Sequence, residues 1–134
     1  MNAKKFIQIV NPKVAVFIKN DIWSNYIYYL KQNNSIIYSV SSKFAKSQFY
    51  FKFYGIWFLE KLRNINYFYV QDFDSKNILE NYSLKNISIS GDSRFSSVIK
   101  TLDENKNIKN IEKFIDKKKC LIAGSVWEKD IDLI

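Results

Sequence analysis

Short runs of apolar, often β-branched residues alternate along this sequence with longer stretches of helical periodicity, and this alternation limits its possible folds more than any other feature. The runs of strand length lie at 14–18, 35–40, 67–70, 86–90 and 119–123. The helical patterns lie at 22–32, 46–62, 74–81 and 95–102, with a short helical turn at 111–115. Strands and helices that alternate at this spacing form βαβ units with right-handed crossovers. The sequence therefore predicts an α/β fold, a Rossmann-like parallel sheet with flanking helices.

Two of these stretches carry sharper expectations. The run at 14–18 is continuously apolar, which is typical of a parallel strand buried on both faces. The stretch at 46–62 is expected to form one long helix whose centre is apolar almost all the way round. Such a helix is either buried or in contact with something apolar. Burial in the core is the commoner case, and contact with a membrane is the alternative.

The residue inventory excludes several kinds of site. The 134 residues include no His and a single Cys, Cys120. Ser-His-Asp triads, Cys-His nucleophiles, His-ligated zinc and disulfide frameworks are therefore impossible within this sequence. It also has neither a GxGxxG nor a Walker motif. We expect no metal and no cofactor. No apolar stretch is long enough for a membrane-spanning helix, and the N-terminus lacks the apolar region of a signal peptide.

The net charge of +8 is concentrated in the first part of the sequence. Such a charge can indicate binding to nucleic acid or to an anionic membrane. However, 19 of the 21 basic residues are Lys, whereas proteins that read nucleic acids depend on Arg. The abundance of Lys, Asn and Ile is typical of an AT-rich genome. We therefore interpret the charge mainly as a consequence of base composition, and we expect no nucleic-acid partner.

Polar segments follow the predicted strands, at the edge where open parallel sheets bind ligands. Asp21 directly follows the first strand. It either caps the next helix or presents a carboxylate that stabilises a cationic transition state or orients an acceptor hydroxyl. Arg94 follows the fourth strand and Gly91. It is either a surface residue of a turn or a clamp for a phosphate or carboxylate. The hypothesis is that Asp21 and Arg94 face one crevice at this edge.

Further candidates for substrate or donor binding lie in the same class of position, and Gly91, which follows the fourth strand, is one of them. Ser41 and Ser42 form a polar loop after the second strand. Gly124 and Ser125 follow the fifth predicted strand, where backbone N–H groups could bind a phosphate or Ser125 could simply cap a helix.

Five segments in order resemble the motifs of one enzyme family. Their sequences are NPKVAVFIKNDIWSNY at 11–26, SVSSKF leading to FKFYG at 39–55, VQDFDSK at 70–76, ISGDSRF at 89–95 and LIAGSVW at 121–127. Together they resemble the motifs of 3-deoxy-D-manno-octulosonic acid (Kdo) transferases, which act in lipopolysaccharide assembly.

This resemblance implies a two-domain GT-B glycosyltransferase with its active site between the domains. It implies transfer of Kdo from CMP-Kdo to the lipid A precursor, without a catalytic metal, at the cytoplasmic face of the bacterial inner membrane. The partners would be CMP-Kdo, the lipid A precursor and the membrane surface, bound peripherally. Asp21 and Arg94 would act in transition-state stabilisation, and Gly124 and Ser125 would lie beside the donor cleft.

The sequence departs from the family pattern at three positions. Asp21 stands where the family normally has Glu, Ser24 where it has Pro and Ser96 where it has Asp. The resemblance also places the catalytic base upstream of Met1 and most CMP contacts downstream of Ile134. The chain is therefore expected to match about the middle third of the enzyme and to be inactive alone.

The expected organisation follows from these motifs. Residues 1–102 would form the second half of the N-terminal acceptor-binding domain, and 103–118 an interdomain linker. Residues 119–134 would supply the first strand and the start of a helix of the donor-binding domain. Two alternatives stay open: another GT-B glycosyltransferase, or a non-catalytic basic module that binds anionic lipid or nucleic acid.

Overall fold

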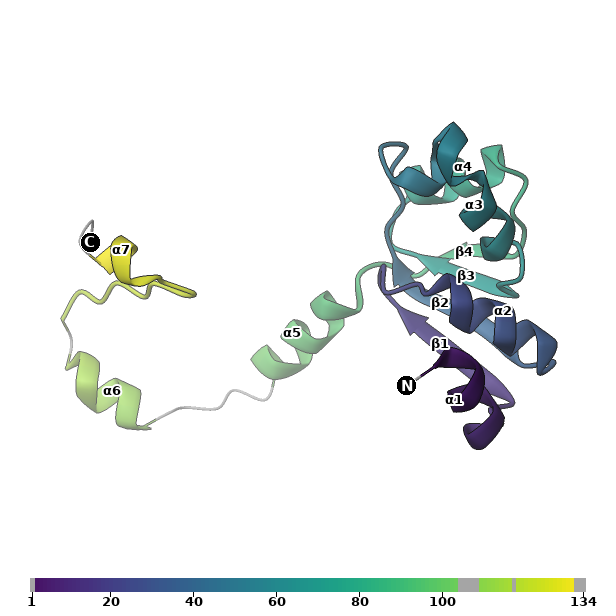
Figure 1. The fold of residues 1–134 in the computed structure, drawn as a ribbon. Coiled ribbons are helices and arrows are strands. Elements are labelled where there is room, and N and C mark those ends of the chain that lie inside the picture. The colour runs from purple at the N-terminus through teal and green to yellow at the C-terminus, as the bar shows by residue number, and fades with distance from the viewer. Residues whose placement is uncertain (1, 104–108, 117, 132–134) are drawn as a thin grey trace. The chain divides into compact units, whose positions relative to one another are not determined.

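The chain forms two compact units, Met1–Ser97 and Val98–Ile134. The structure, a computed structural model, describes residues 2–103, 109–116 and 118–131 (Figure 1). α5 (Ser93–Asp103) spans the boundary between the two units. The sequence-based domain end at 102 stays a prediction.

In the described part of the first unit, four parallel strands form one sheet in the order β1-β2-β3-β4 (Figure 1). They are β1 (Val14–Ile18), β2 (Ile36–Ser42), β3 (Tyr67–Val70) and β4 (Ile87–Ile89). Strands that follow one another in the sequence are also neighbours in the sheet, so the right-handed crossovers place their helices on the same face. The predicted α/β, Rossmann-like parallel sheet with flanking helices is confirmed.

Helices connect the strands and extend beyond them. Within the described ranges they are α1 (Ala3–Val10), α2 (Ser24–Gln32), the 3-10 turns η1 (Phe49–Phe51) and η2 (Phe53–Gly55), α3 (Ile56–Leu62), α4 (Phe73–Asn81), α5 (Ser93–Asp103), α6 (Lys109–Ile115) and α7 (Glu128–Ile131). The sequence did not predict α1. Asn2 caps it by accepting a hydrogen bond from the Lys4 N–H at 3.0 Å, and its buried Ile7 joins the core.

The core lies between the sheet and the crossover helices. Side chains from both layers are almost fully buried there, and they include Ile27, Leu30, Ile37, Leu62, Phe68, Val70 and Leu79. On β1, Ala15 and Phe17 pack against this cluster. This side of the sheet is called the covered face below.

The opposite side, called the open face below, consists of Val14, Val16, Ile18, Ile36, Tyr38, Val40, Tyr67, Tyr69 and Ser88, which alternate along the strands with residues of the covered face. Val16 is 54% exposed, and Tyr38 and Tyr67 stack with ring centroids 5.3 Å apart. Within the described part of the first unit, the strand at 14–18 is therefore covered on one face only. The prediction that it is buried on both faces was wrong. All crossovers within this unit run in one direction, so their helices cover only one face.

The predicted single helix over 46–62 was also wrong. Lys52 is extended, with φ −96° and ψ 158°, and separates η1 from η2. At Gly55 the chain folds back so closely that a Cβ atom would lie 1.9 Å from the Phe49 carbonyl oxygen. The break allows Tyr50 and Phe51 to pack edge to face against Phe44. Aromatic packing therefore overrides helical periodicity in this segment.

One predicted element of the second unit is confirmed and another is wrong. The helical turn predicted at 111–115 lies within α6, whereas residues 119–123 form no strand in the structure. The linker predicted at 103–118 stays a prediction. Residues 104–108 and 117 of that linker lie outside the described residues. A strand needs a neighbouring strand for its backbone hydrogen bonds, and the described residues of this unit include no other strand. No described helix is long and apolar enough to cross a membrane.

Candidate functional site

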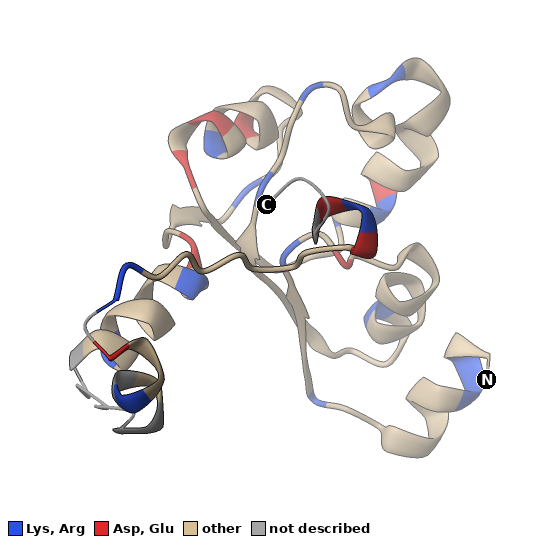
Figure 2. Ribbon diagram, turned by 90° about the vertical axis from the view of Figure 1, so that its left-hand side faces the viewer, with Lys and Arg blue, Asp and Glu red and all other residues tan. Residues whose placement is uncertain are grey.

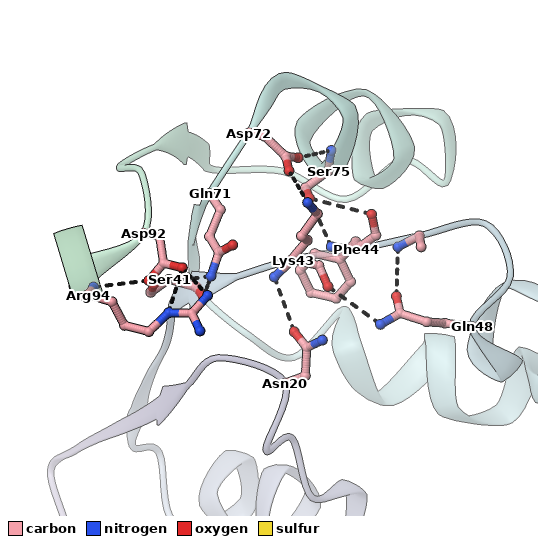
Figure 3. Close-up of polar contacts among 11 residues, drawn as sticks. Asn20, Ser41, Lys43, Phe44, Gln48, Gln71, Asp72, Ser75, Asp92 and Arg94 are labelled. Atoms are coloured by element: carbon pink, nitrogen blue, oxygen red, sulfur yellow. Dashed lines mark hydrogen bonds and ion pairs between the residues drawn. The ribbon is translucent and has the colours of Figure 1, made fainter. Parts of the chain in front are cut away.

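The candidate site lies at the carboxyl edge of the sheet, where all four parallel strands end (Figure 3). Asp21 follows β1 and Arg94 follows β4, so both lie beyond this same edge. However, β1 and β4 are the two outer strands. Three spacings between neighbouring strands separate them, roughly 14 Å. The chain after β4 nevertheless returns towards β2, because Ser93, the neighbour of Arg94, donates its N–H to the Ser41 hydroxyl oxygen at the end of β2 at 3.2 Å.

Asp21 does not cap a helix. α2 begins at Ser24 with Trp23 at the N-cap position and without a side-chain cap. Asp21 is exposed and lines a pocket of about 550 Å³ together with Val16, Phe17, Ile18, Trp23 and Tyr26. This leaves the carboxylate able to accept hydrogen bonds from the hydroxyl groups of a ligand.

Trp23 is a site residue that the sequence prediction missed. The helical pattern predicted at 22–32 includes Trp23, but Trp23 precedes α2 and is 63% exposed in the pocket that Asp21 lines. An indole that is partly exposed next to a carboxylate offers both an apolar face and a polar tip to a ligand. The sequence feature that could have identified Trp23 as a site residue is its position two residues after Asp21, within the segment at 11–26 that carries the family resemblance.

Arg94 is held by Asp92. Its Nε donates to Asp92 Oδ2 at 2.8 Å, and its backbone N–H donates to Asp92 Oδ1 at 3.0 Å. These hydrogen bonds, with a smaller contribution from the charge of Lys19, lower the pKa of Asp92 to about 2. The Asp92 side chain is only 8% exposed, whereas that of Arg94 is 70% exposed. The guanidinium is thus oriented by a neighbouring carboxylate and still accessible to an anion.

The predicted binding residues Ser41 and Ser42 are buried. The Ser41 hydroxyl oxygen accepts a hydrogen bond from the Ser93 N–H at 3.2 Å. Its carbonyl oxygen accepts one from Gln71 Nε2 at 2.8 Å. The Ser42 hydroxyl is hydrogen-bonded to that of Ser39. These contacts join the ends of β2 and β3 to the start of α5 (Figure 3), and any contact of the two serines with substrate stays a prediction.

The remaining candidates for substrate or donor binding are Gly91, Gly124 and Ser125. Gly91 has a φ of 75°, which favours glycine and directs the chain from β4 towards Asp92 and Arg94. Gly124 and Ser125 belong to the second compact unit. Their role beside a donor stays a prediction.

A second polar network, which sequence reasoning did not assign to the site, is centred on Lys43 and Asp72. The Lys43 Nζ lies 3.3 Å from Asp72 Oδ2, and its backbone N–H donates to Asn20 Oδ1 at 3.1 Å. Asp72 caps α4 by accepting a hydrogen bond from the Ser75 N–H at 2.8 Å. Hydrogen bonds from Ser75 are the main cause of the lowered pKa of Asp72, and Lys43 adds to it.

Charge at this edge is local rather than part of a broad basic surface. Lys and Arg are spread over many elements of the chain (Figure 2). Among the described residues, no group of three or more Cys, Asp or Glu side chains is arranged to hold a metal ion. The edge thus offers an exposed carboxylate at Asp21, a cation at Arg94 and the Lys43–Asp72 pair.

A family model described as 3-deoxy-D-manno-octulosonic-acid transferase (kdotransferase) matches residues 1–97. The chain belongs to this family. Kdo transferases are glycosyltransferases of lipopolysaccharide biosynthesis, and the matched region ends at the same residue as the first compact unit. No curated protein and no solved structure matches the chain.

Proposed function

We propose that this chain contributes the acceptor side of a Kdo transferase with a two-domain GT-B arrangement. The substrates are CMP-Kdo and the lipid A precursor, and the reaction takes place at the cytoplasmic face of the inner membrane. The observation that carries the proposal is the family match over residues 1–97, the unit whose carboxyl edge holds Asp21 and Arg94. No cofactor or metal is assigned to the reaction.

The charges at the edge suit the chemistry of this transfer. An acceptor hydroxyl oxygen attacks the anomeric carbon of Kdo, the bond from that carbon to the CMP phosphate oxygen breaks, and a carboxylate base takes the hydroxyl proton. The transition state is cationic at the sugar and anionic at the leaving phosphate. Asp21 would stabilise the sugar side and Arg94 the phosphate side.

The chain alone is proposed to be inactive, because the family resemblance assigns the base and most of the donor contacts to segments outside these residues. Incubation of the purified chain with CMP-Kdo and a lipid A precursor is therefore expected to yield no product. Product above background would show that the chain carries its own base and a sufficient donor site.

The role of the edge is tested in a chimera in which residues 1–97 replace the matching segment of an active Kdo transferase. Asp21→Asn is expected to lower kcat about 100-fold or more, because it removes a charge that acts in the transition state. Asp21→Glu, which restores the usual family residue, is the matched control and should retain activity. If Asp21→Asn and Arg94→Ala both leave kcat unchanged, the assignment of this edge is wrong and the basic binding module becomes the better account.

A further inference from the structure

One segment of the first unit combines exposed aromatic residues with exposed lysines. Its outward-facing large apolar side chains, called the aromatic surface below, are Phe49, Phe53, Tyr54, Ile56 and Trp57. Phe53 is 85% exposed and Trp57 is 58% exposed. Isolated apolar residues on a surface need no explanation, but five within nine residues form a patch that points to an interaction.

The aromatic surface is held in place from beneath. The same segment turns Tyr50, Phe51 and Phe58 into the core. Tyr50 and Phe58 stack with ring centroids 5.4 Å apart, and Tyr82 donates a hydrogen bond from its hydroxyl to the Phe51 carbonyl oxygen at 3.1 Å. The close approach at Gly55 fixes the turn between the two 3-10 segments. The exposed rings are therefore carried on an ordered turn and do not fold back onto the protein.

The charges around the aromatic surface have one sign. Residues 43–59 include three lysines and no acidic residue. Lys46 and Lys52 are exposed, and within the described residues neither forms an ion pair. Glu60, the first acid after the segment, is paired with Arg63 at 3.1 Å. The aromatic surface is thus bordered by cations whose charge is available to an anionic partner.

This combination fits a lipid bilayer better than a protein. Aromatic side chains next to lysines are typical of surfaces that enter the headgroup region of anionic membranes. A second copy of the chain related by a twofold axis would bring the same lysines together, so charge disfavours that occupant. On the open face of the sheet, by contrast, Tyr38 and Tyr67 stack on one another.

We propose that the aromatic surface, with Lys46 and Lys52, docks this chain onto an anionic membrane by inserting Phe53 and Trp57 among the lipid headgroups. The inference extends the proposed function, since it identifies the part of the chain that meets the membrane holding the acceptor. Lys43 and Phe44, which take part in the network at the carboxyl edge, lie a few residues before this segment. Docking would therefore bring that edge close to the lipid surface.

Vesicle binding by the full chain tests the proposal without any donor or acceptor. The chain is expected to co-sediment with vesicles of phosphatidylethanolamine and phosphatidylglycerol. The double substitution Phe53→Ser with Trp57→Ser should weaken binding about tenfold or more, because it removes the inserted apolar area. Both side chains are exposed, so circular dichroism should show an unchanged fold. Val14→Ser with Ile36→Ser, on the open face, is the matched control and should bind normally.

Trp57 itself reports on insertion. In a chain with Trp23→Phe and Trp127→Phe, vesicles of the same composition that carry brominated acyl chains should quench the remaining tryptophan fluorescence. The proposal is overturned if Trp57 is not quenched, if both double variants weaken binding equally, or if the aromatic substitutions abolish self-association of the chain and leave vesicle binding intact.

These outcomes are independent of the transfer reaction. Asp21→Asn is expected to bind vesicles like the unchanged chain, although it should inactivate the chimera. Loss of vesicle binding in Phe53→Ser with Trp57→Ser together with full chimera activity in Asp21→Asn would support the docking surface and reject the proposed function. The reverse pattern would reject the docking surface alone.

Discussion

The covered and open faces of the sheet differ in what lies against them and not in how apolar they are. Phe68 on the covered face is buried beneath the crossover helices, whereas its neighbour Tyr67 on the open face is 42% exposed. β2 makes the contrast sharper. Ser39 on the covered face is fully buried, and Val40 on the open face is only half-buried. Burial in this unit therefore follows the positions of the helices rather than the hydropathy of each residue.

The largest expected effect compares adjacent residues of β3. Phe68→Ala removes a ring that is 1% exposed and should lower the free energy of unfolding by about 3–5 kcal/mol. Tyr67→Ala removes mainly the stacking with Tyr38 and should cost about 1 kcal/mol. Urea denaturation followed by circular dichroism measures both. Equal losses would mean that the open face is covered in solution, and the comparison would fail.

A smaller effect concerns the buried serine pair. Ser39→Ala leaves the buried Ser42 hydroxyl without the partner it has in the structure, which should lower the free energy of unfolding by about 1–3 kcal/mol. Ser88→Ala, the same change on the exposed open face, should stay within about 0.5 kcal/mol of the unchanged chain. The comparison is again made by urea denaturation. A neutral Ser39→Ala would show that the covered face tolerates an unpaired hydroxyl at this position.

The smallest expected effect lies at the carboxyl edge shared by both faces. The pKa of Asp92 is about 2 in the folded chain, against an ordinary value of 3.8, mainly because of its hydrogen bonds with Arg94. The charged carboxylate is thus favoured in the folded state. The stability that it contributes is complete above pH about 4 and is lost as the pH falls towards 2. Arg94→Ala should raise the pKa of Asp92 towards 3.8, as read from its carboxyl carbon chemical shift in an NMR titration. An unchanged pKa would show that the pair does not form in solution.

Local sequence patterns predicted most of the first unit. The strand at 14–18 and the strand at 67–70 have the predicted bounds, and α2 ends at the predicted residue, Gln32. Periodicity succeeds there because each element presents one apolar side to one neighbouring layer. It fails at 46–62, where nearly every residue is apolar and the pattern does not distinguish a helix from a turn that divides its rings between core and surface.

The candidate site was only partly predictable. Asp21 and Arg94 follow strands of a parallel sheet, so topology alone predicts that both lie at the carboxyl edge. The sequence does not indicate that Asp92 holds Arg94, that Ser41 is buried beneath the start of α5, or that Lys43 pairs with Asp72. The contacts of Ser41 and of Lys43 join residues far apart in the sequence, and the geometry at Ser41 depends on its left-handed backbone, with φ 54°. The Asp92–Arg94 contact is local, but its geometry depends on how the turn after Gly91 is folded.

The amino-acid sequence by itself determined the parallel α/β class and the order in which its polar segments reach one edge. Both follow from the alternation of apolar runs and from the handedness of the crossovers. Only the tertiary structure decided which face of the sheet is buried, where the aromatic segment breaks and that Lys43 pairs with Asp72. Those outcomes depend on contacts between residues far apart in the chain, because a side chain is buried only where another layer covers it.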